Sequence, residues 1–170
     1  MRKNDNIETE RLILHPLTRE NIQMLLSDVS EFEDTYHLIL YDEWDEYLSE
    51  GYLFRLEKEI AFDPENYLFF TQFLIILKEN RRAVGLIGYK YVPRGGITEV
   101  GYGLFFPYKG HGYMTEALTA LLETGRRLGI KRVYADTNPD NIKSQNVLKR
   151  CGFRFLWEDT NLWWEKELQP

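Results

Sequence analysis

The sequence predicts an α/β (α+β) fold in which helices flank a mixed, mostly antiparallel sheet. Short polar turns separate three strand-like segments, which is typical of an antiparallel meander. These segments are residues 67–78, 83–92 and 99–106. A helical pattern over residues 113–128 and another strand over 131–137 follow. A strand–helix–strand unit joins parallel strands through a right-handed crossover. The sheet is therefore a meander extended by one parallel step.

Composition narrows the class of protein. We expect residues 1–170 to form one domain, and the 44% of hydrophobic residues argues against disorder. The single cysteine excludes an internal disulfide and fits a reducing compartment. No apolar run approaches the roughly 20 residues of a membrane span, and the polar residues 1–6 lack a signal-peptide core. These features predict a cytoplasmic protein that contacts no membrane.

Charge and histidine spacing exclude two further classes of ligand. The net charge is −6, and a negative protein is repelled by the phosphate backbone of nucleic acid, so we expect no broad binding to nucleic acid. His15, His37 and His111 are too far apart in the sequence to show a metal-ligand pattern, so no metal site is predicted. The sequence leaves open whether the protein is a monomer or a homodimer.

The chain begins with a predicted strand over residues 8–17 and a helix after it. Thr18 is a suitable N-cap, and Leu17 and Ile22 have the spacing of a hydrophobic staple. Residues 28–65 then carry thirteen acidic and two basic side chains, a net charge of −11, with aromatic residues interleaved. We interpret them as amphipathic helices. Their acidic face is either simply solvated or a site that attracts a cationic ligand through charge and cation–π contact.

The central stretch runs from Glu99 to the helix at residue 113. Bulky residues alternate with Gly101 and Gly103, so one face of this strand is bare and another group can approach it closely. Gly110 and Gly112 then allow unusual backbone angles before the helix begins. The free N–H groups and the dipole of a helix N-terminus favour an anion, although such a turn can also serve only to reverse the chain.

The remaining elements follow ordinary helix and turn signals. Gly129 is expected to end the central helix, where basic residues of the last turn favour the helix dipole. Asn141 is expected to cap the next helix, and Gly152 to end it. Residues 153–158 and 161–168 are predicted to form a closing hairpin.

Three segments resemble one protein family. Residues 109–118 resemble the coenzyme A pyrophosphate loop of the GNAT superfamily of N-acetyltransferases, usually written Gln/Arg-x-x-Gly-x-Gly/Ala, with Pro107 in the Gln/Arg place. Residues 8–18 resemble the opening of its RimJ/RimL-like branch. Residues 138–153 resemble that branch's Asn-x-x-Ser and Gly-Phe pattern, with Asn141, Ser144 and Gly152 in place.

The resemblance implies a fold and a coenzyme. The GNAT fold has about seven strands and about four helices, and its strands 4 and 5 splay apart, here near residues 104–106, to receive the pantetheine arm of acetyl-CoA. The segment between strands 1 and 2 commonly helps to form the acceptor pocket. The coenzyme-binding residues implied for this chain are Leu104, Phe105, Phe106, Lys109, Gly110, His111, Gly112, Tyr113, Met114, Thr115, Asn141 and Ser144.

The same resemblance implies acetyl transfer from acetyl-CoA directly to a primary amine. Glu99 is the candidate general base, acting through water. Many relatives protonate the thiolate with a tyrosine at the position held here by Leu148, so Ser144 is the leading substitute. Acceptors consistent with the resemblance are a protein N-terminus, an aminoglycoside, a polyamine or another small amine, and a cationic amine is slightly favoured. The alternatives are a non-catalytic sensor of acetyl-CoA and an interaction module.

Overall fold

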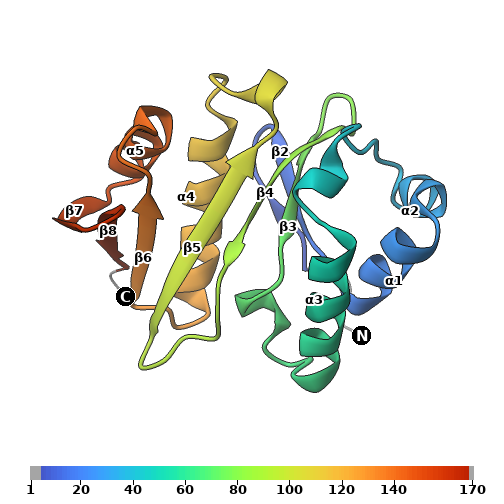
Figure 1. Ribbon diagram of the computed structural model, residues 1–170, viewed down its shortest axis with the longest axis horizontal. Coiled ribbons are helices and arrows are strands. Elements are labelled where there is room, and N and C mark those ends of the chain that lie inside the picture. Colours follow the sequence, from blue (N-terminus) through green and yellow to red (C-terminus); the bar gives the residue numbers. More distant parts are fainter. Residues whose placement is uncertain (1–4, 169–170) are drawn as a thin grey trace.

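The computed structural model describes residues 5–168, so the polar start at residues 1–4 lies outside the described residues. Eight strands form one sheet in the order β1-β2-β3-β4-β5-β6-β8-β7 (Figure 1). The strands are β1 (Ile7–Glu8), β2 (Leu12–Pro16), β3 (Phe73–Leu77), β4 (Ala83–Tyr89), β5 (Ile97–Leu104), β6 (Arg132–Thr137), β7 (Arg154–Glu158) and β8 (Leu162–Glu167). The helices are α1 (Arg19–Ser27), α2 (Val29–Tyr36), α3 (Glu50–Phe62), α4 (Tyr113–Arg127) and α5 (Ile142–Arg150).

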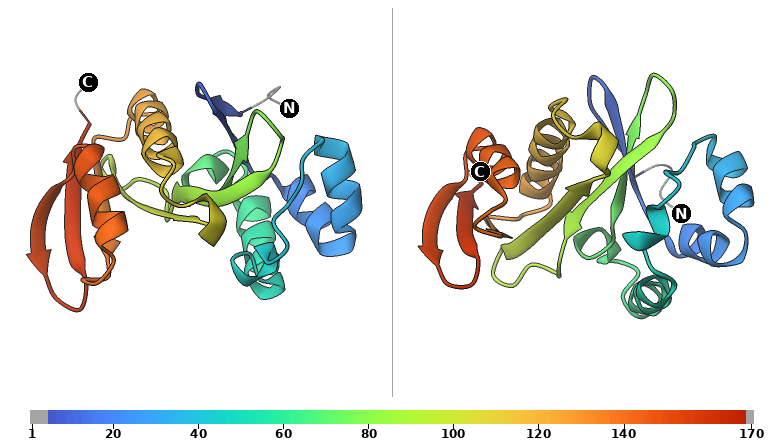
Figure 2. Two further views of the ribbon diagram at one scale, coloured as in Figure 1. Left: turned by 90° about the horizontal axis from the view of Figure 1, so that it is seen from above. Right: turned by 45° about the horizontal axis from the view of Figure 1, so that its top comes forward.

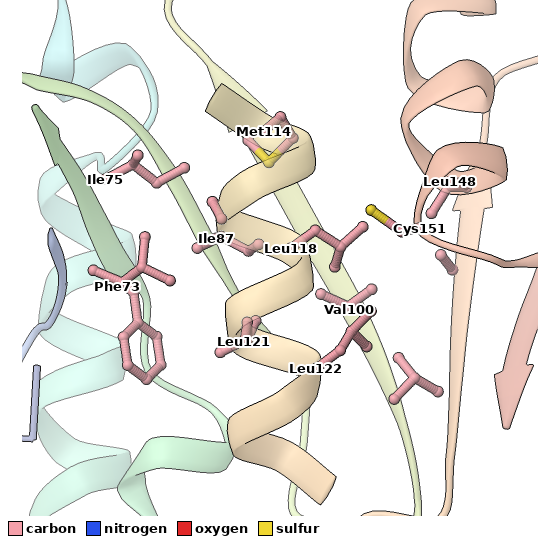
Figure 3. Packing of buried hydrophobic residues seen from close by; sticks show 14 of the residues in the cluster. Phe73, Ile75, Ile87, Val100, Met114, Leu118, Leu121, Leu122, Leu148 and Cys151 are labelled. Atoms are coloured by element: carbon pink, nitrogen blue, oxygen red, sulfur yellow. The ribbon is translucent and has the colours of Figure 1, made fainter. Parts of the chain in front are cut away.

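Helices cover both faces of the sheet (Figures 1 and 2). The apolar side chains of α4 and α5 pack with Val84, Ile87 and Val100 in one buried cluster, which Figure 3 shows from close by. The apolar side chains of α1, α2 and α3 pack with Leu74 and Ile76 in a second cluster on the other face. This two-sided burial explains why β3 and β4 read as continuous apolar runs.

The predicted α+β fold with a mixed, mostly antiparallel sheet is confirmed, and some element boundaries differ. The strand predicted over 8–17 is divided, because Thr9 accepts a hydrogen bond from the Leu12 N–H through its side chain (2.9 Å) and turns the chain between β1 and β2. The strand predicted over 67–78 begins only at Phe73, because Tyr67–Phe69 forms a 3₁₀ helix. The central strand ends at Leu104, before Pro107.

The predicted caps are confirmed. Thr18 accepts a hydrogen bond from the Asn21 N–H (3.2 Å) through its side chain, and Oδ1 of Asn21 accepts one from the Thr18 N–H (3.0 Å), which completes a capping box. Asn141 accepts from the Ser144 N–H (3.1 Å) at the start of α5. Gly129 lies just past α4 with a φ of +89°, in the left-handed region that a glycine tolerates.

The two parallel strands, β5 and β6, are paired at one end and diverge at the other, and we call this divergence the fork. Strands β5 and β6 pair only at Ile97–Glu99, opposite Arg132–Tyr134, and within the described chain no further pair joins them. β5 continues to Leu104 along β4, while β6 continues to Thr137 along β8. The two strands therefore diverge towards the top of Figure 1, and the fork that the resemblance implied is present.

Among residues 5–168, no helix is both long enough and apolar enough to cross a membrane.

Candidate functional site

The open edge of β5 is the first part of the site. Glu99 and Phe105 bond to the β4 side through their backbone: Glu99 O accepts from the Lys90 N–H (2.9 Å), and the Phe105 N–H donates to Val84 O (3.0 Å). Backbone groups alternate in direction along a strand, so those of Val100, Tyr102 and Leu104 face the fork instead. An extended ligand with amide groups can pair with this edge as a neighbouring strand would.

A cleft of about 410 Å³ opens beside that edge. Its walls come from the end of β5, the glycine loop, the first turn of α4 and one side of α5, with Tyr47 contributed by the acidic segment. The lining residues are Tyr47, Tyr102, Gly103, Leu104, Lys109, Gly110, Gly112, Met114, Thr115, Asn141, Lys143, Ser144, Asn146, Val147 and Arg150. Segments far apart in the sequence thus meet at the fork.

Most of the residues proposed to hold coenzyme line this cleft, and four do not. Phe105 is buried beneath Tyr41 and Tyr47, with ring centroids 4.9 and 4.8 Å away. Phe106 is 77% exposed. His111 and Tyr113 stack on each other (5.5 Å) but are absent from the lining of the cleft.

The cleft suits an anionic ligand. Gly110 and Gly112 have φ values of +91° and +81°, so both need the left-handed conformation that glycine adopts without strain. The loop they form precedes the N-terminus of α4, whose first N–H groups have no partner inside the helix. Lys109, Lys143 and Arg150 add positive charge to the walls. The arrangement combines the three features that bind phosphate: backbone N–H groups, a helix dipole and cations.

A hydroxyl pair lies inside the cleft. The phenol oxygen of Tyr102, from β5, is 3.0 Å from Oγ of Ser144 on α5 and also donates to the Ser144 carbonyl oxygen (3.3 Å). Burial raises the pKa of Tyr102 to about 12, and the hydrogen bond to Ser144 offsets part of this rise. Tyr102 is therefore a neutral proton donor at physiological pH.

Glu99 is placed apart from this pair. Its carboxylate contacts Nζ of Lys90, which also bonds Oδ1 of Asp136 (3.1 Å), so one ammonium group joins β4, β5 and β6 at the base of the fork. Burial lowers the pKa of Lys90, but its hydrogen bonds to Glu99 and Asp136 outweigh that effect and the pKa is raised. Glu99 does not line the cleft; it lies four residues before Gly103, about 13 Å along the strand.

Comparison with known proteins decides the family. The family model described as "Acetyltransferase (GNAT) domain" matches residues 11–154 of this chain. The chain belongs to the GNAT acetyltransferase family. It is 32% identical over 104 residues to YnaD of Bacillus subtilis, an uncharacterized N-acetyltransferase; the match covers 56% of this chain and 60% of YnaD.

Solved GNAT structures share the fold. The ribosomal-protein-S5-alanine acetyltransferase of Vibrio fischeri superposes with a TM-score of 0.70 at 20% identity, covering 96% of this chain and 97% of that one. RimL, a ribosomal L7/L12 α-N-protein acetyltransferase in complex with coenzyme A, superposes with a TM-score of 0.67 at 18% identity, covering 96% and 98%. The GNAT fold that the sequence resemblance implied is thus confirmed by these solved structures.

Sequence reasoning missed several lining residues of this GNAT domain. Lys143, Asn146, Val147 and Arg150 recur at the spacing of one helix face, and that periodicity was the available signal. Tyr102 gave a weaker signal, as a tyrosine between two glycines. Its hydrogen bond to α5 depends on the width of the fork, which no local pattern encodes.

Substituting Gly103 tests the cleft directly. An added Cβ at Gly103 meets nothing within 4 Å, whereas one at Gly85 on the adjoining strand would meet the Gly103 carbonyl oxygen at 2.3 Å. We expect Gly103→Val to fold with a nearly unchanged melting temperature but to lose coenzyme A binding by at least about tenfold, because the side chain fills the cleft. Gly85→Val should instead destabilise the fold by about 1–3 kcal/mol. Isothermal titration and thermal unfolding provide the measurements, and normal binding by Gly103→Val would contradict the assignment.

Proposed function

We propose that this protein is an acetyl-CoA-dependent N-acetyltransferase that transfers an acetyl group directly to a primary amine. The observation that carries the proposal is the cleft at the fork, where an open strand edge, a cationic glycine loop and a neutral hydroxyl pair meet. Membership in the GNAT family and the coenzyme A bound in the RimL structure support the same ligand.

The chemistry of the cleft suggests how the coenzyme lies. The pyrophosphate is proposed to bind the backbone N–H groups of Gly110–Gly112 and the first turn of α4, with Lys109, Lys143 and Arg150 near its charges. The pantetheine amides are proposed to pair with the edge groups of Tyr102 and Leu104. This orientation directs the thioester along the fork towards Ser144.

Acyl transfer then requires two proton movements. The neutral amine attacks the thioester carbonyl, a C–N bond forms, and the C–S bond breaks to release the thiolate of coenzyme A. The attacking nitrogen loses a proton in this step, and that proton replaces the one that the hydroxyl pair gives to the thiolate. We assign protonation of that thiolate to Ser144, with the Tyr102 hydroxyl turning its hydrogen bond from the Ser144 carbonyl oxygen to Oγ as the proton leaves. Leu148 is buried with no exposed surface, so it does not reach the cleft, and the hydroxyl pair occupies the role that a tyrosine has in many relatives.

The other proton leaves the substrate ammonium before attack. Glu99 remains the proposed base, and its distance from Gly103 means that water must carry the proton along the bare face of β5. Added Cβ atoms at Gly101 and Gly103 would meet only the Lys90 side chain (3.4 Å) or open space, so this face has room for such waters. Lys90 Nζ contacts the Glu99 carboxylate and holds it at the base of the fork.

Removing the two hydroxyls tests the proposal. We expect Ser144→Ala to lower kcat about 100-fold, the low end for loss of a general acid, and Tyr102→Phe to lower it by a smaller factor, while acetyl-CoA binding persists. Ser27→Ala is the matched control, since Ser27 Oγ bonds two carbonyl oxygens of its own helix, Gln23 O (2.9 Å) and Met24 O (3.2 Å), and does not line the cleft. Unchanged turnover in both variants would contradict the proton-donor assignment. Binding without turnover on any primary amine in the unmodified protein would favour the acetyl-CoA sensor.

The acceptor is proposed to be a cationic amine. Four exposed carboxylates flank Tyr41 and Tyr47 in the sequence; both tyrosine rings pack on Phe105, and Tyr47 lines the cleft. No ion pair within residues 5–168 involves any of the four, which are Asp42, Glu43, Asp45 and Glu46. A hydrogen bond to Glu43 raises the pKa of the Tyr41 phenol to about 12. Other acidic side chains of residues 28–65 stabilise local structure, as Asp28 does by capping α2.

Neutralising the four carboxylates should separate a substrate site from a solvated surface. The combined variant Asp42→Asn, Glu43→Gln, Asp45→Asn, Glu46→Gln is expected to raise KM for a dicationic amine about tenfold at low salt and less at high salt, with KM for acetyl-CoA unchanged. The control removes the same charge from exposed positions outside the cleft: Glu20→Gln, Glu31→Gln, Asp34→Asn and Glu65→Gln. Equal effects of the two sets would contradict the acceptor assignment.

A further inference from the structure

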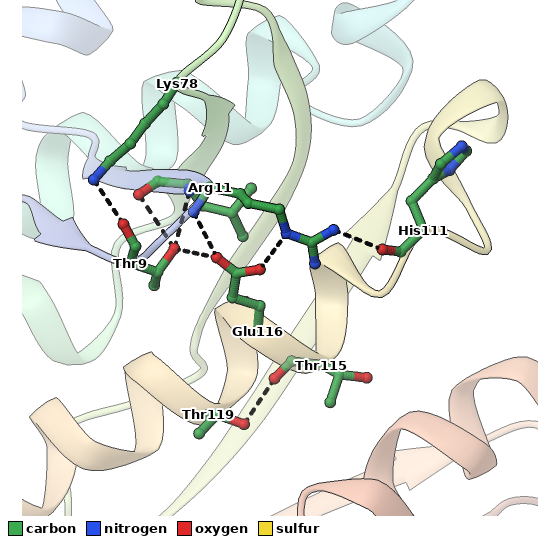
Figure 4. Close-up of polar contacts among 8 residues, drawn as sticks. Thr9, Arg11, Lys78, His111, Thr115, Glu116 and Thr119 are labelled. Atoms are coloured by element: carbon green, nitrogen blue, oxygen red, sulfur yellow. Dashed lines mark hydrogen bonds and ion pairs between the residues drawn. The ribbon is translucent and has the colours of Figure 1, made fainter.

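The glycine loop has a support on the side away from the cleft. Arg11, in the turn between β1 and β2, donates from Nη1 to the carbonyl oxygen of His111 (3.1 Å) and from Nε to Oε2 of Glu116 on α4 (2.7 Å), as Figure 4 shows. Its guanidinium lies 4.7 Å above the ring of Tyr113. Arg11 does not line the cleft, so it touches the loop from behind.

The bond to His111 fixes the orientation of one peptide group. The His111 carbonyl and the Gly112 N–H belong to the same peptide, which is planar and trans, so the two groups point in opposite directions. Arg11 holds the carbonyl on its own side, and the Gly112 N–H is therefore directed away from Arg11. Gly112 lines the cleft. Without this bond, the free φ of Gly112 would leave the peptide able to rotate.

Arg11 also balances a charge that would oppose an anion. Glu116 is in the first turn of α4, beside the loop, and its carboxylate also accepts from the Arg11 N–H (2.9 Å) and from Thr9 Oγ1 (2.6 Å). Burial raises the pKa of Glu116, but the hydrogen bonds from Thr9 and Arg11 outweigh it and the pKa is lowered. An ionised carboxylate near a phosphate site repels the phosphate unless a cation neutralises it.

We propose that Arg11 is a positioning residue for the phosphates of the coenzyme, acting through the His111–Gly112 peptide and the charge of Glu116. The inference rests on the proposed function, since it concerns the same coenzyme site. It assigns a binding role to the turn between β1 and β2, 100 residues before the loop. The ion pair contributes little to stability, because the Arg11 side chain is 45% exposed.

The test compares two acetyl donors, acetyl-CoA and S-acetylpantetheine, which lacks the pyrophosphate. We expect Arg11→Gln to raise the Kd and KM for acetyl-CoA about tenfold, the low end of the effect of losing an outer-shell partner at metal sites. The kcat at saturation and the kcat/KM for S-acetylpantetheine should stay near wild-type. Arg11→Lys keeps the positive charge but lacks the planar guanidinium group, so it should recover part of the affinity that Arg11→Gln loses.

Arg19→Gln is the matched control. Arg19 Nε bonds Glu57 Oε1 (2.5 Å), and the side-chain exposures of that pair, 54% and 16%, resemble the 45% and 19% of Arg11 and Glu116. The control should leave binding of acetyl-CoA unchanged. Equal losses with both donors in Arg11→Gln, or a fall in melting temperature that explains the whole loss, would overturn the inference and indicate a purely structural role.

The variant Arg11→Gln/Glu116→Gln separates charge from orientation. Removing the carboxylate should restore part of the affinity that Arg11→Gln loses. An affinity equal to that of Arg11→Gln alone would overturn the charge-balancing part of the proposal.

These experiments distinguish failure of the proposed function from failure of the positioning role of Arg11. If the unmodified protein does not bind acetyl-CoA, the proposed function fails; if it binds and Arg11→Gln binds equally well, only the positioning role fails.

Discussion

The divergence of β5 and β6 is the constraint on which the site depends. Three residue pairs hold the strands together at Ile97–Glu99, and beyond them each strand keeps only its outer neighbour. A sheet interior normally satisfies both edges of every strand, so an unpaired edge inside the domain is costly unless water or a ligand pairs with it. The unpaired edge of β5 borders the cleft.

The crossover connection places the anion-binding elements at the open end of the fork. Because β5 leads directly through the glycine loop into α4, the helix N-terminus lies where β5 ends, next to the unpaired edge. The Lys90 contacts at the base of the fork and the Arg11 contacts behind the loop hold these parts from two sides. The proposed binding and proton transfer would therefore use one continuous arrangement of backbone and side chains.

Local signals in the sequence predicted most helices, most strands and the glycine loop. Features that depend on contacts between residues far apart in the sequence were not predicted. The Asn141 cap, the glycine loop and the mixed sheet follow from residue types and short spacings. The break at Thr9 was not predicted, because that turn is stabilised partly by Glu116, 107 residues away. Tyr102 was missed for the same reason: its partner Ser144 is brought near only by the packing of α5.

Amide hydrogen exchange with and without acetyl-CoA tests the central claim most directly. If the coenzyme fills the fork, the amides of Tyr102, Leu104 and Gly112 should exchange at least about tenfold more slowly when acetyl-CoA is bound, because each then donates to the ligand. Amides of β3, which are paired on both sides, should change little. Saturated binding without added protection at Tyr102 and Leu104 would contradict the account, since the coenzyme would then lie outside the fork.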